Sequence, residues 1–301
     1  MKDVWTIEAV VRWATDDFRA RGIESPRLDA ELLLAFALKT DRIRLVVDAR
    51  RPLESDELAR FRELVKRRRT HEPIAFLRGE REFYGRLFRV DSRVLIPRPD
   101  TEVLVQIALE RTRHVSMCMR ALDLCTGSGC VAITLGRERP TSRVIATDVS
   151  DDALAVARSN AHRLGAYNVG WARGDLFGAL GALTARVGSV NGEAARAATF
   201  DLVTANPPYI PSDEIATLAP DIRSFEPHLA LDGGKDGLDV VRRIVNDAPA
   251  SLRRGGVLAL EVGAGEAMAV HAHFEERGFR EVKIARDYGG IERVVSGIFG
   301  G

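Results

Sequence analysis

The sequence predicts an α/β protein with a seven-stranded, mostly parallel sheet, preceded by a small helical domain and a β-hairpin. Three observations predict this fold. Apolar residues recur at helical spacing over about the first 70 residues, a short strand-like stretch follows, and short apolar strands then alternate with helical segments after residue 100. We therefore expect a helical domain at 1–73, a hairpin linker at 74–96 and a sheet domain at 97–301.

The helical domain begins with an apolar stripe within Val4–Phe18. Ser25-Pro26 is typical of a helix start, because serine caps free backbone N–H groups and proline suits the first helical position. Further helices are expected after Asp41 and after Ser55. The last ends in the basic run Lys66–Arg69, which indicates either a solvated final turn that suits the helix dipole or a contact surface for a partner.

The linker is predicted to be a hairpin because residues typical of strands flank a glycine. The strand-like segments are Phe83-Tyr84-Gly85, Leu87-Phe88-Arg89-Val90 and Val94-Leu95-Ile96, with Gly85 in or near the bend.

The sheet domain is expected to contain seven strands, at 121–124, 144–148, 169–172, 200–205, 257–262, 281–285 and 293–298. Predicted helices cover 101–113, 131–139, 151–164, 237–252 and 265–277. The turn sequence Asp287–Gly290 leaves no room for a crossover helix, so the last two strands should pair antiparallel. Residues 178–199 are rich in Gly, Ala, Ser and Thr and are interpreted as a surface insertion.

Composition narrows the classes of function. The 301 residues carry a net charge of +1, which argues against a general polyanion binder with a basic stripe. No apolar run approaches the ~20 residues that span a bilayer, and the N-terminus has no apolar signal core. The 3 cysteines lack Cys-x-x-Cys spacing and a nearby histidine. We expect a reduced, cytoplasmic, monomeric protein with no metal, membrane or nucleic-acid partner.

A glycine-containing turn predicts one half of a ligand site. Asp123-Leu124-Cys125-Thr126-Gly127-Ser128-Gly129 follows a strand and opens a helix, and glycines there allow a tight turn and a close approach of ligand to backbone. An ordinary glycine turn is the alternative. The spacing is not Gly-x-Gly-x-x-Gly and no Gly-Lys-Ser/Thr occurs, so a phosphate-binding loop is not expected.

Acidic residues at the next two strand ends add to this site. Asp148 is placed to accept hydrogen bonds from both hydroxyls of a ribose. Its alternative role is a carboxylate at a helix N-terminus, although Ser150 is the better cap. Asp175 is placed to accept from an adenine amino group or to stabilise a turn. Together these residues predict an adenosine site without a phosphate grip, which fits S-adenosylmethionine.

Asn206-Pro207-Pro208-Tyr209 directly follows a predicted strand, at the edge where such sheets bind ligands. Two prolines remove two backbone donors, so nearby carbonyls are free to face a substrate. The Asn206 side-chain oxygen and the Pro207 carbonyl are then placed to accept both hydrogens of one planar NH₂ group, with Tyr209 packed on its plane. This arrangement would direct the nitrogen lone pair at a methyl group. A proline-stiffened loop without chemistry is the alternative.

Both motifs resemble those of Rossmann-like, class I methyltransferases that use S-adenosylmethionine and act on nitrogen. Asn-Pro-Pro-Tyr is shared by adenine-N6 DNA methyltransferases and protein glutamine methyltransferases. Nearly the whole chain resembles one family, the bacterial peptide chain release factor glutamine methyltransferases (PrmC/HemK). The other segments that carry this resemblance are Leu28–Leu34, Glu82–Gly85, Leu95–Glu102, Phe225–Pro227 and Asp236–Leu238.

The resemblance implies methyl transfer from S-adenosylmethionine, which becomes S-adenosylhomocysteine, to the side-chain amide nitrogen (N5) of the glutamine in the release factors' Gly-Gly-Gln motif. It implies that residues 125–129 and Asp148 hold the methyl donor and that Asp175-Leu176 lie at its adenine. The Asn206–Tyr209 segment would hold the glutamine, with Asn206, Pro207 and Tyr209 as the catalytic residues and Asn206 also touching the donor. Release factors are the expected partners, recognised in part by the helical domain.

Two positions depart from the family pattern. Cys125 stands where the family commonly has glycine, and cysteine tolerates fewer backbone angles. Leu176 stands where the family often has an aromatic residue, which predicts weaker packing on the adenine.

Two other activities remain as alternatives. Asp-x-Cys-Thr-Gly-Ser-Gly-Cys resembles the sister enzyme that methylates a glutamine of ribosomal protein uL3, although Ile96–Glu102 and the segment from Asp287 to Val295 match the release-factor enzymes better. An adenine-N6 nucleic-acid methyltransferase would need a basic groove and a region that accepts a flipped base, against which the +1 charge argues. A binding module without catalysis would leave Asn-Pro-Pro-Tyr without a purpose.

Overall fold

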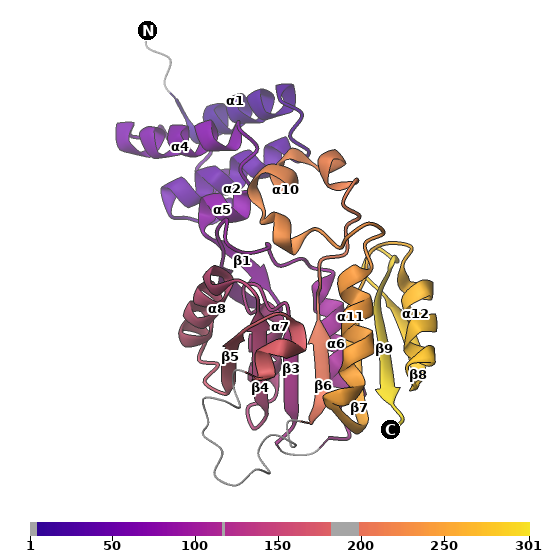
Figure 1. Cartoon of the computed structure of the whole chain (residues 1–301). Helices are drawn as coiled ribbons and strands as arrows, with labels where there is room; N and C mark the ends of the chain where they lie inside the picture. The colour runs from indigo at the N-terminus through magenta and orange to yellow at the C-terminus, as the bar shows by residue number, and fades with distance from the viewer. Residues whose placement is uncertain (1–4, 116–117, 182–198) are drawn as a thin grey trace. The chain divides into compact units, whose positions relative to one another are not determined.

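The computed structural model describes residues 5–115, 118–181 and 199–301 (Figure 1). These residues form two compact units, one spanning Met1–Glu80 and Ala219–Phe225 and the other Arg81–Leu218 and Glu226–Gly301. Within the described residues, no helix is long and apolar enough to cross a membrane.

The first unit is helical. Its helices are α1 (Ile7–Ala20), α2 (Pro26–Leu38), α3 (Arg42–Val47), α4 (Ser55–Arg68), α5 (Ile74–Arg78) and α10 (Pro220–Phe225). The apolar faces of α1 to α5 share one core, in which Phe18, Leu33, Leu34 and Phe61 are fully buried, whereas α10 buries no residue. Ser25 precedes α2 as predicted but makes no side-chain cap. The fourth helix begins at Ser55 rather than after it, capped by a reciprocal Glu54–Glu57 box.

The basic run at the end of α4 is only partly solvated: Lys66 and Arg67 are exposed, whereas Arg68 is buried and Arg69 is half-buried. The expected solvated turn is therefore wrong for Arg68, and a contact surface for a partner stays a prediction. Arg68 is buried and donates through Nε to Asp29 over 2.8 Å, while Arg69 forms two 2.8 Å hydrogen bonds with Asp17. Arg67 pairs with Glu72. These partners lie within the same unit, so three of the run's charges tie helices and turns together there.

The second unit is built on a sheet. Its strands are β1 (Glu80–Phe83), β2 (Arg86–Arg89), β3 (Arg120–Leu124), β4 (Arg143–Asp148), β5 (Val169–Arg173), β6 (Phe200–Ala205), β7 (Leu252–Glu261), β8 (Phe279–Arg286) and β9 (Glu292–Phe299). Its helices are α6 (Thr101–Arg111), α7 (Cys130–Glu138), α8 (Asp151–Leu164), α11 (Asp239–Asp247) and α12 (Ala267–Glu276), with short 3₁₀ turns η1 (Leu176–Gly178), η3 (Ile215–Thr217), η4 (His228–Ala230) and η5 (Ala248–Ala250).

The large sheet has the order β5-β4-β3-β6-β7-β9-β8 (Figure 1). Neighbouring strands from β5 to β7 pair in parallel, whereas β9 pairs antiparallel with both β7 and β8. Among the described strands of this sheet, β9 is thus the one that runs in the opposite direction. The predicted seven-stranded sheet with one antiparallel strand near its end is confirmed.

Side-chain alternation along the strands divides the core between the two faces of the sheet. Ala121 of β3 packs in a cluster with residues of α6, α7 and α8, and its neighbour Leu122 packs in a second cluster with residues of α11 and α12. The strands are therefore covered on both faces, which explains their almost continuous apolar sequences.

The hairpin prediction was too long at both ends. Residues 74–78 form α5, and Val94–Ile96 belong to no strand, although Val94 and Ile96 are buried. Burial without strand pairing produces the same apolar pattern as a strand, which explains the error. The turn itself lies at Tyr84-Gly85, as expected.

Most of the predicted insertion at 178–199 falls on residues 182–198, which lie outside the described residues.

Asn160 of α8 joins three segments of the second unit. Its buried side chain accepts a 2.8 Å hydrogen bond from the Arg89 backbone N–H. It donates 3.0 Å bonds to the Arg89 and Ser128 carbonyls. The amide thus ties the hairpin and the glycine-containing turn to one helix.

We predict that Asn160→Ala lowers the free energy of unfolding by about 1–3 kcal/mol, because it leaves buried backbone groups without partners. Urea denaturation followed by circular dichroism measures the change. Asn246→Ala, on an exposed face of α11, is the matched control and should change stability by less than about 0.5 kcal/mol. Equal effects of the two substitutions would contradict the role of Asn160.

Candidate functional site

The predicted site residues come together at one edge of the sheet because β3, β4, β5, β6 and β7 are parallel. Their carboxyl ends lead into Cys125, Asp148, the turn at Asp175, Asn206 and Glu261, respectively. In the pairing of β6 with β7, Ala205 lies opposite Leu260, which places Asn206 beside Glu261. Residues from distant parts of the sequence are thereby aligned along one edge.

Asp123 of β3 stabilises the glycine-containing turn. This buried carboxyl accepts hydrogen bonds from the Thr126 hydroxyl over 2.6 Å and from the Thr204 hydroxyl over 2.8 Å. Burial raises its pKa to about 7 against the lowering effect of these bonds. Gly129 has φ +80°, and a Cβ there would lie 2.9 Å from Ile133 and 3.1 Å from Ala157. Gly129 therefore meets both a conformational and a packing requirement for glycine.

Cys125 adopts φ +54°, in the left-handed region that favours glycine. The sequence predicted a restricted backbone angle here, because Cys125 stands where the family commonly has glycine. Burial raises the pKa of its thiol, and the nearby carboxylates Asp148 and Asp123 add to this shift, so the side chain is a neutral wall of the site.

Asp148 anchors the turn and faces a cavity. Its two carboxyl oxygens accept 2.9 Å hydrogen bonds from the backbone N–H groups of Gly127 and Ser150. Burial raises the pKa of Asp148, opposed by these bonds. Ser150 caps α8 as predicted, since its hydroxyl accepts from the Ala153 N–H over 3.2 Å, and Asp148 accepts from the N–H of this cap residue. The Asp148 carboxyl retains lone pairs that can accept hydrogen bonds from a ligand.

The turn after β5 forms another wall. Asp175 makes a 2.6 Å ion pair with Arg243 of α11, and both side chains are about half exposed. Leu176 is buried, with φ +48°. The sequence analysis did not predict this ion pair between Arg243 and Asp175.

A cavity of about 390 Å³ lies between these walls, within the range of small-ligand sites. Seven of the twelve predicted site residues line it: Cys125, Gly127, Asp148, Asp175, Leu176, Asn206 and Pro208. The other five, Thr126, Ser128, Gly129, Pro207 and Tyr209, do not form its walls. Three carboxylates, Asp148, Asp175 and Asp232, line the cavity with the polar turn, and its two arginines, Arg93 and Arg243, are paired with Asp91 and Asp175. This lining suits a nucleoside with a cationic group, as S-adenosylmethionine has.

Asn206 is oriented by a residue that the sequence analysis did not assign to the site. Its Nδ2 donates to the Thr101 hydroxyl over 3.1 Å, so Oδ1 lies on the opposite side of the amide. Thr101 is the first residue of α6 and is buried.

The segment after Asn206 is clamped by a glycine-rich loop. The Ile210 N–H bonds to the Leu231 carbonyl over 3.0 Å, and the Gly233 N–H bonds to the Ile210 carbonyl over 2.9 Å. Gly237, at φ +79°, lies so close to the Tyr209 carbonyl that a Cβ would collide with it. This contact explains a glycine in the Asp236-Gly237-Leu238 motif.

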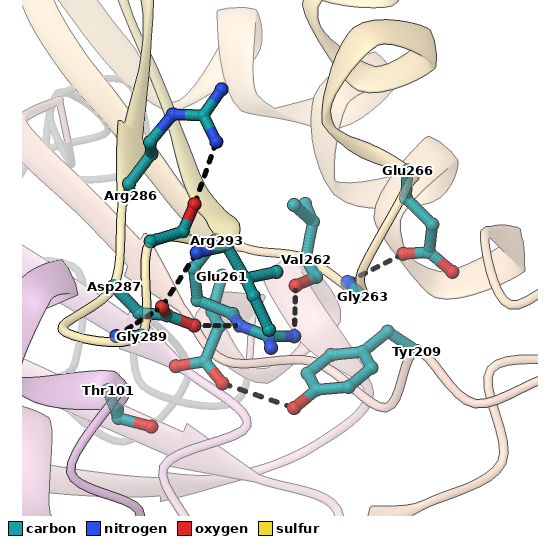
Figure 2. Close-up of polar contacts among 12 residues, drawn as sticks. Thr101, Tyr209, Glu261, Val262, Gly263, Glu266, Arg286, Asp287, Gly289 and Arg293 are labelled. Atoms are coloured by element: carbon teal, nitrogen blue, oxygen red, sulfur yellow. Dashed lines mark hydrogen bonds and ion pairs between the residues drawn. The ribbon is translucent and has the colours of Figure 1, made fainter.

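The buried carboxyls Glu226 and Glu261 complete the surroundings of the site. Glu226 accepts from Arg98 over 2.5 Å and from the Ile96 N–H over 3.0 Å. Glu261 accepts from the Tyr209 hydroxyl over 3.2 Å, next to Arg293, which pairs with Asp287 (Figure 2). The motifs near 96–102 and 225–227 were noted in the sequence, but periodicity carries no signal for such pairings across the chain.

Comparisons with known proteins match both parts of the chain. Residues 9–79 match the family described as PrmC N-terminal domain, and residues 121–225 match a methyltransferase domain family. The release factor glutamine methyltransferase of Geobacter sulfurreducens is 42% identical over 298 residues, covering 99% of this chain and 98% of the relative. The Cereibacter sphaeroides protein of the same name is 42% identical over 287 residues, covering 95% and 96%.

Among solved structures, the hMettl16 catalytic domain in complex with MAT2A 3'UTR hairpin 6 has a TM-score of 0.54 at 14% identity, covering 71% of this chain and 76% of that chain. This likeness concerns the methyltransferase fold alone. The full-length relatives carry the assignment, and the chain belongs to the release factor glutamine methyltransferase family.

Proposed function

We propose that the protein transfers a methyl group from S-adenosylmethionine to the side-chain amide nitrogen of the glutamine in the Gly-Gly-Gln motif of a peptide chain release factor. The single observation that carries the proposal is the orientation of Asn206. Asn206 lines the same cavity as Asp148 and Asp175, the residues proposed to bind the methyl donor. Its Nδ2 donates a hydrogen bond to the Thr101 hydroxyl, which leaves Oδ1 to accept from the amide of the substrate. The names of relatives at 42% identity support a release factor glutamine as the acceptor.

The proposed residues act by binding and orientation. Asp148 accepts from the ribose hydroxyls, Asp175 and Leu176 lie at the adenine, and residues 125–129 shape the turn around the donor. Asn206 Oδ1 and the Pro207 carbonyl accept the two N–H groups of the glutamine amide, while Tyr209 and Pro208 bound its plane.

This grip directs the nitrogen lone pair at the methyl carbon. The new carbon–nitrogen bond forms as the carbon–sulfur bond breaks, sulfur keeps the electron pair, and S-adenosylhomocysteine is released. The surplus proton on nitrogen leaves to water after transfer. We further propose that the helical region at 1–73 recognises the release factor, and that the protein acts as a cytoplasmic monomer without a metal or direct nucleic-acid binding.

The acceptor is tested by offering methyl-labelled S-adenosylmethionine with release factor, with uL3 or with adenine-containing DNA, and locating the label by mass spectrometry. We expect label on the Gly-Gly-Gln glutamine. Replacing that glutamine by asparagine should lower the rate about 10²-fold, because a shorter side chain misplaces the amide by about 1 Å. Label on uL3 or on adenine alone would reassign the substrate.

We predict that Asp148→Ala raises the Kd for S-adenosylmethionine at least about tenfold, since a hydrogen bond to a charged group contributes roughly 1.5–3 kcal/mol. Isothermal titration calorimetry measures the Kd. The control is Asp151→Ala, which removes an exposed carboxylate paired with Arg173 and should leave the Kd within about twofold. An unchanged Kd in Asp148→Ala would remove Asp148 from the donor site.

We predict that Asn206→Ala lowers kcat by at least about 10²-fold through lost orientation, while the protein stays folded. Asn206→Asp keeps an acceptor but adds a charge beside the sulfonium, and it should also be impaired. Single-turnover methylation of release factor gives the rates, with Asn246→Ala as the control. Near-normal turnover of either Asn206 variant would show that this amide does not hold the glutamine.

A further inference from the structure

The segment Ile96–Glu102 is a motif of the sequence of which only Thr101 has a place in the proposed reaction so far. It joins the hairpin to α6, and its residues before Thr101 belong to no helix or strand. Ile96 and Thr101 are buried. None of the seven residues lines the 390 Å³ cavity, so any effect on methyl transfer must pass through a residue that does.

The buried Glu226 carboxyl holds the start of this segment. Its Oε2 accepts from the Ile96 backbone N–H over 3.0 Å, and its Oε1 accepts from the Arg98 guanidinium over 2.5 Å. The Glu226 side chain is 1% exposed, so water does not compete for these bonds. A hydrogen bond between a guanidinium and a carboxylate is among the strong ones in proteins. The two bonds together fix the backbone at 96 and the side chain at 98.

Two prolines stiffen the segment on either side of Arg98. The rings of Pro97 and Pro99 each fix φ at about −65°, and Pro99 also restricts the conformation of Arg98, the residue before it. The Arg98 carbonyl accepts from the Thr101 N–H over 3.1 Å. The position of Arg98 therefore determines where Thr101 lies.

The end of the segment contacts the cavity through one residue. The Thr101 hydroxyl accepts from Asn206 Nδ2 over 3.1 Å. Thr101 is 1% exposed and β-branched, so its hydroxyl has few alternative positions. The next residue, Glu102, accepts from the Tyr84 N–H of the hairpin turn over 2.9 Å, which holds the start of α6 from the other side.

We propose that the Ile96–Glu102 segment positions the Asn206 amide for methyl transfer, with Glu226 as its anchor and Thr101 as its contact. Glu226 holds Arg98, whose carbonyl in turn holds Thr101. Thr101 then holds the amide of Asn206. The inference rests on the proposed function and extends it to residues that do not line the cavity.

Thr101 variants test the contact. Thr101→Val removes the hydroxyl while keeping the shape, and it should lower kcat about tenfold because the Asn206 amide is no longer held in place. Thr101→Ser should return kcat to within about threefold of wild type, and the Kd for S-adenosylmethionine should change by less than about threefold in both. The control is Thr112→Val, which removes a buried hydroxyl that donates to the Ala108 carbonyl over 2.7 Å at the other end of α6. It should leave kcat within about twofold of wild type.

Glu226→Gln tests the anchor. It keeps an acceptor but loses the charge that holds Arg98, and it should lower kcat about fivefold. In the Thr101→Val background the same change should lower kcat by less than about twofold, because both residues act through one contact. Glu292→Gln, whose carboxyl pairs with Arg286, is the control and should leave kcat within about twofold in both backgrounds. Should Glu226→Gln fail to fold, Arg98→Lys weakens the same bond and replaces it in the comparison.

Two outcomes of these rate measurements would overturn the inference. One is a Thr101→Val enzyme with the kcat of wild type. The other is a pair of losses that multiply in the double variant, because residues that act independently give independent effects.

The side-chain amide protons of Asn206 give a readout that does not depend on the acceptor. In the substrate-free protein, their NMR signals are identified by their absence in Asn206→Ala. They should exchange with water at least about tenfold faster in Thr101→Val than in wild type, and Thr101→Ser should restore slow exchange. Equal exchange in wild type and Thr101→Val would overturn the inference. Slow exchange in a wild type that labels no release factor would overturn the proposed function alone.

Discussion

The parallel pairing of β3, β4, β6 and β7 is the constraint on which the rest of the site depends. Parallel strands bring their carboxyl ends to one edge, so each loop that leaves the sheet there delivers one polar group. Asp123, Asp148, Asn206 and Glu261 are 138 residues apart in sequence at the extremes, counting from 123 to 261, yet they share this edge. Hydrogen bonds to backbone N–H groups and to threonine or tyrosine hydroxyls then fix each side chain locally.

Much of this could be predicted from the sequence, because the signals were local. Short apolar runs that alternate with helical segments predicted the strands, and β6 was predicted with the bounds observed. The short Asp287–Gly290 turn correctly implied the antiparallel pair, since no crossover could fit. The glycine-containing turn and Asn206-Pro207-Pro208-Tyr209 have fixed spacing after their strands and supply four of the seven predicted site residues that line the cavity. The other three, Asp148, Asp175 and Leu176, lie at the ends of two further strands.

The remainder depends on contacts between distant residues, for which local sequence has no signal. Thr101 and Asn206 are separated by 105 positions, and Glu226 and Ile96 by 130. Residues 74–78 were taken for part of a hairpin because five residues are too few to show a helical period. The pairing of Arg68 and Arg69 could not be predicted because their carboxylate partners, Asp29 and Asp17, lie 39 and 52 residues away.

The place of β9 has a consequence for synthesis on the ribosome. β8 precedes β9 in sequence, but β9 lies between β7 and β8, so β8 cannot join the sheet until the later strand has emerged. Chains are made from the N-terminus at about 5–20 residues per second, and earlier segments begin folding first. Arg293, which flanks Glu261, arrives with β9 as well. During translation, the cofactor side of the sheet can therefore assemble before the surroundings of Tyr209 are complete, and a nascent chain stalled before β9 would lack them.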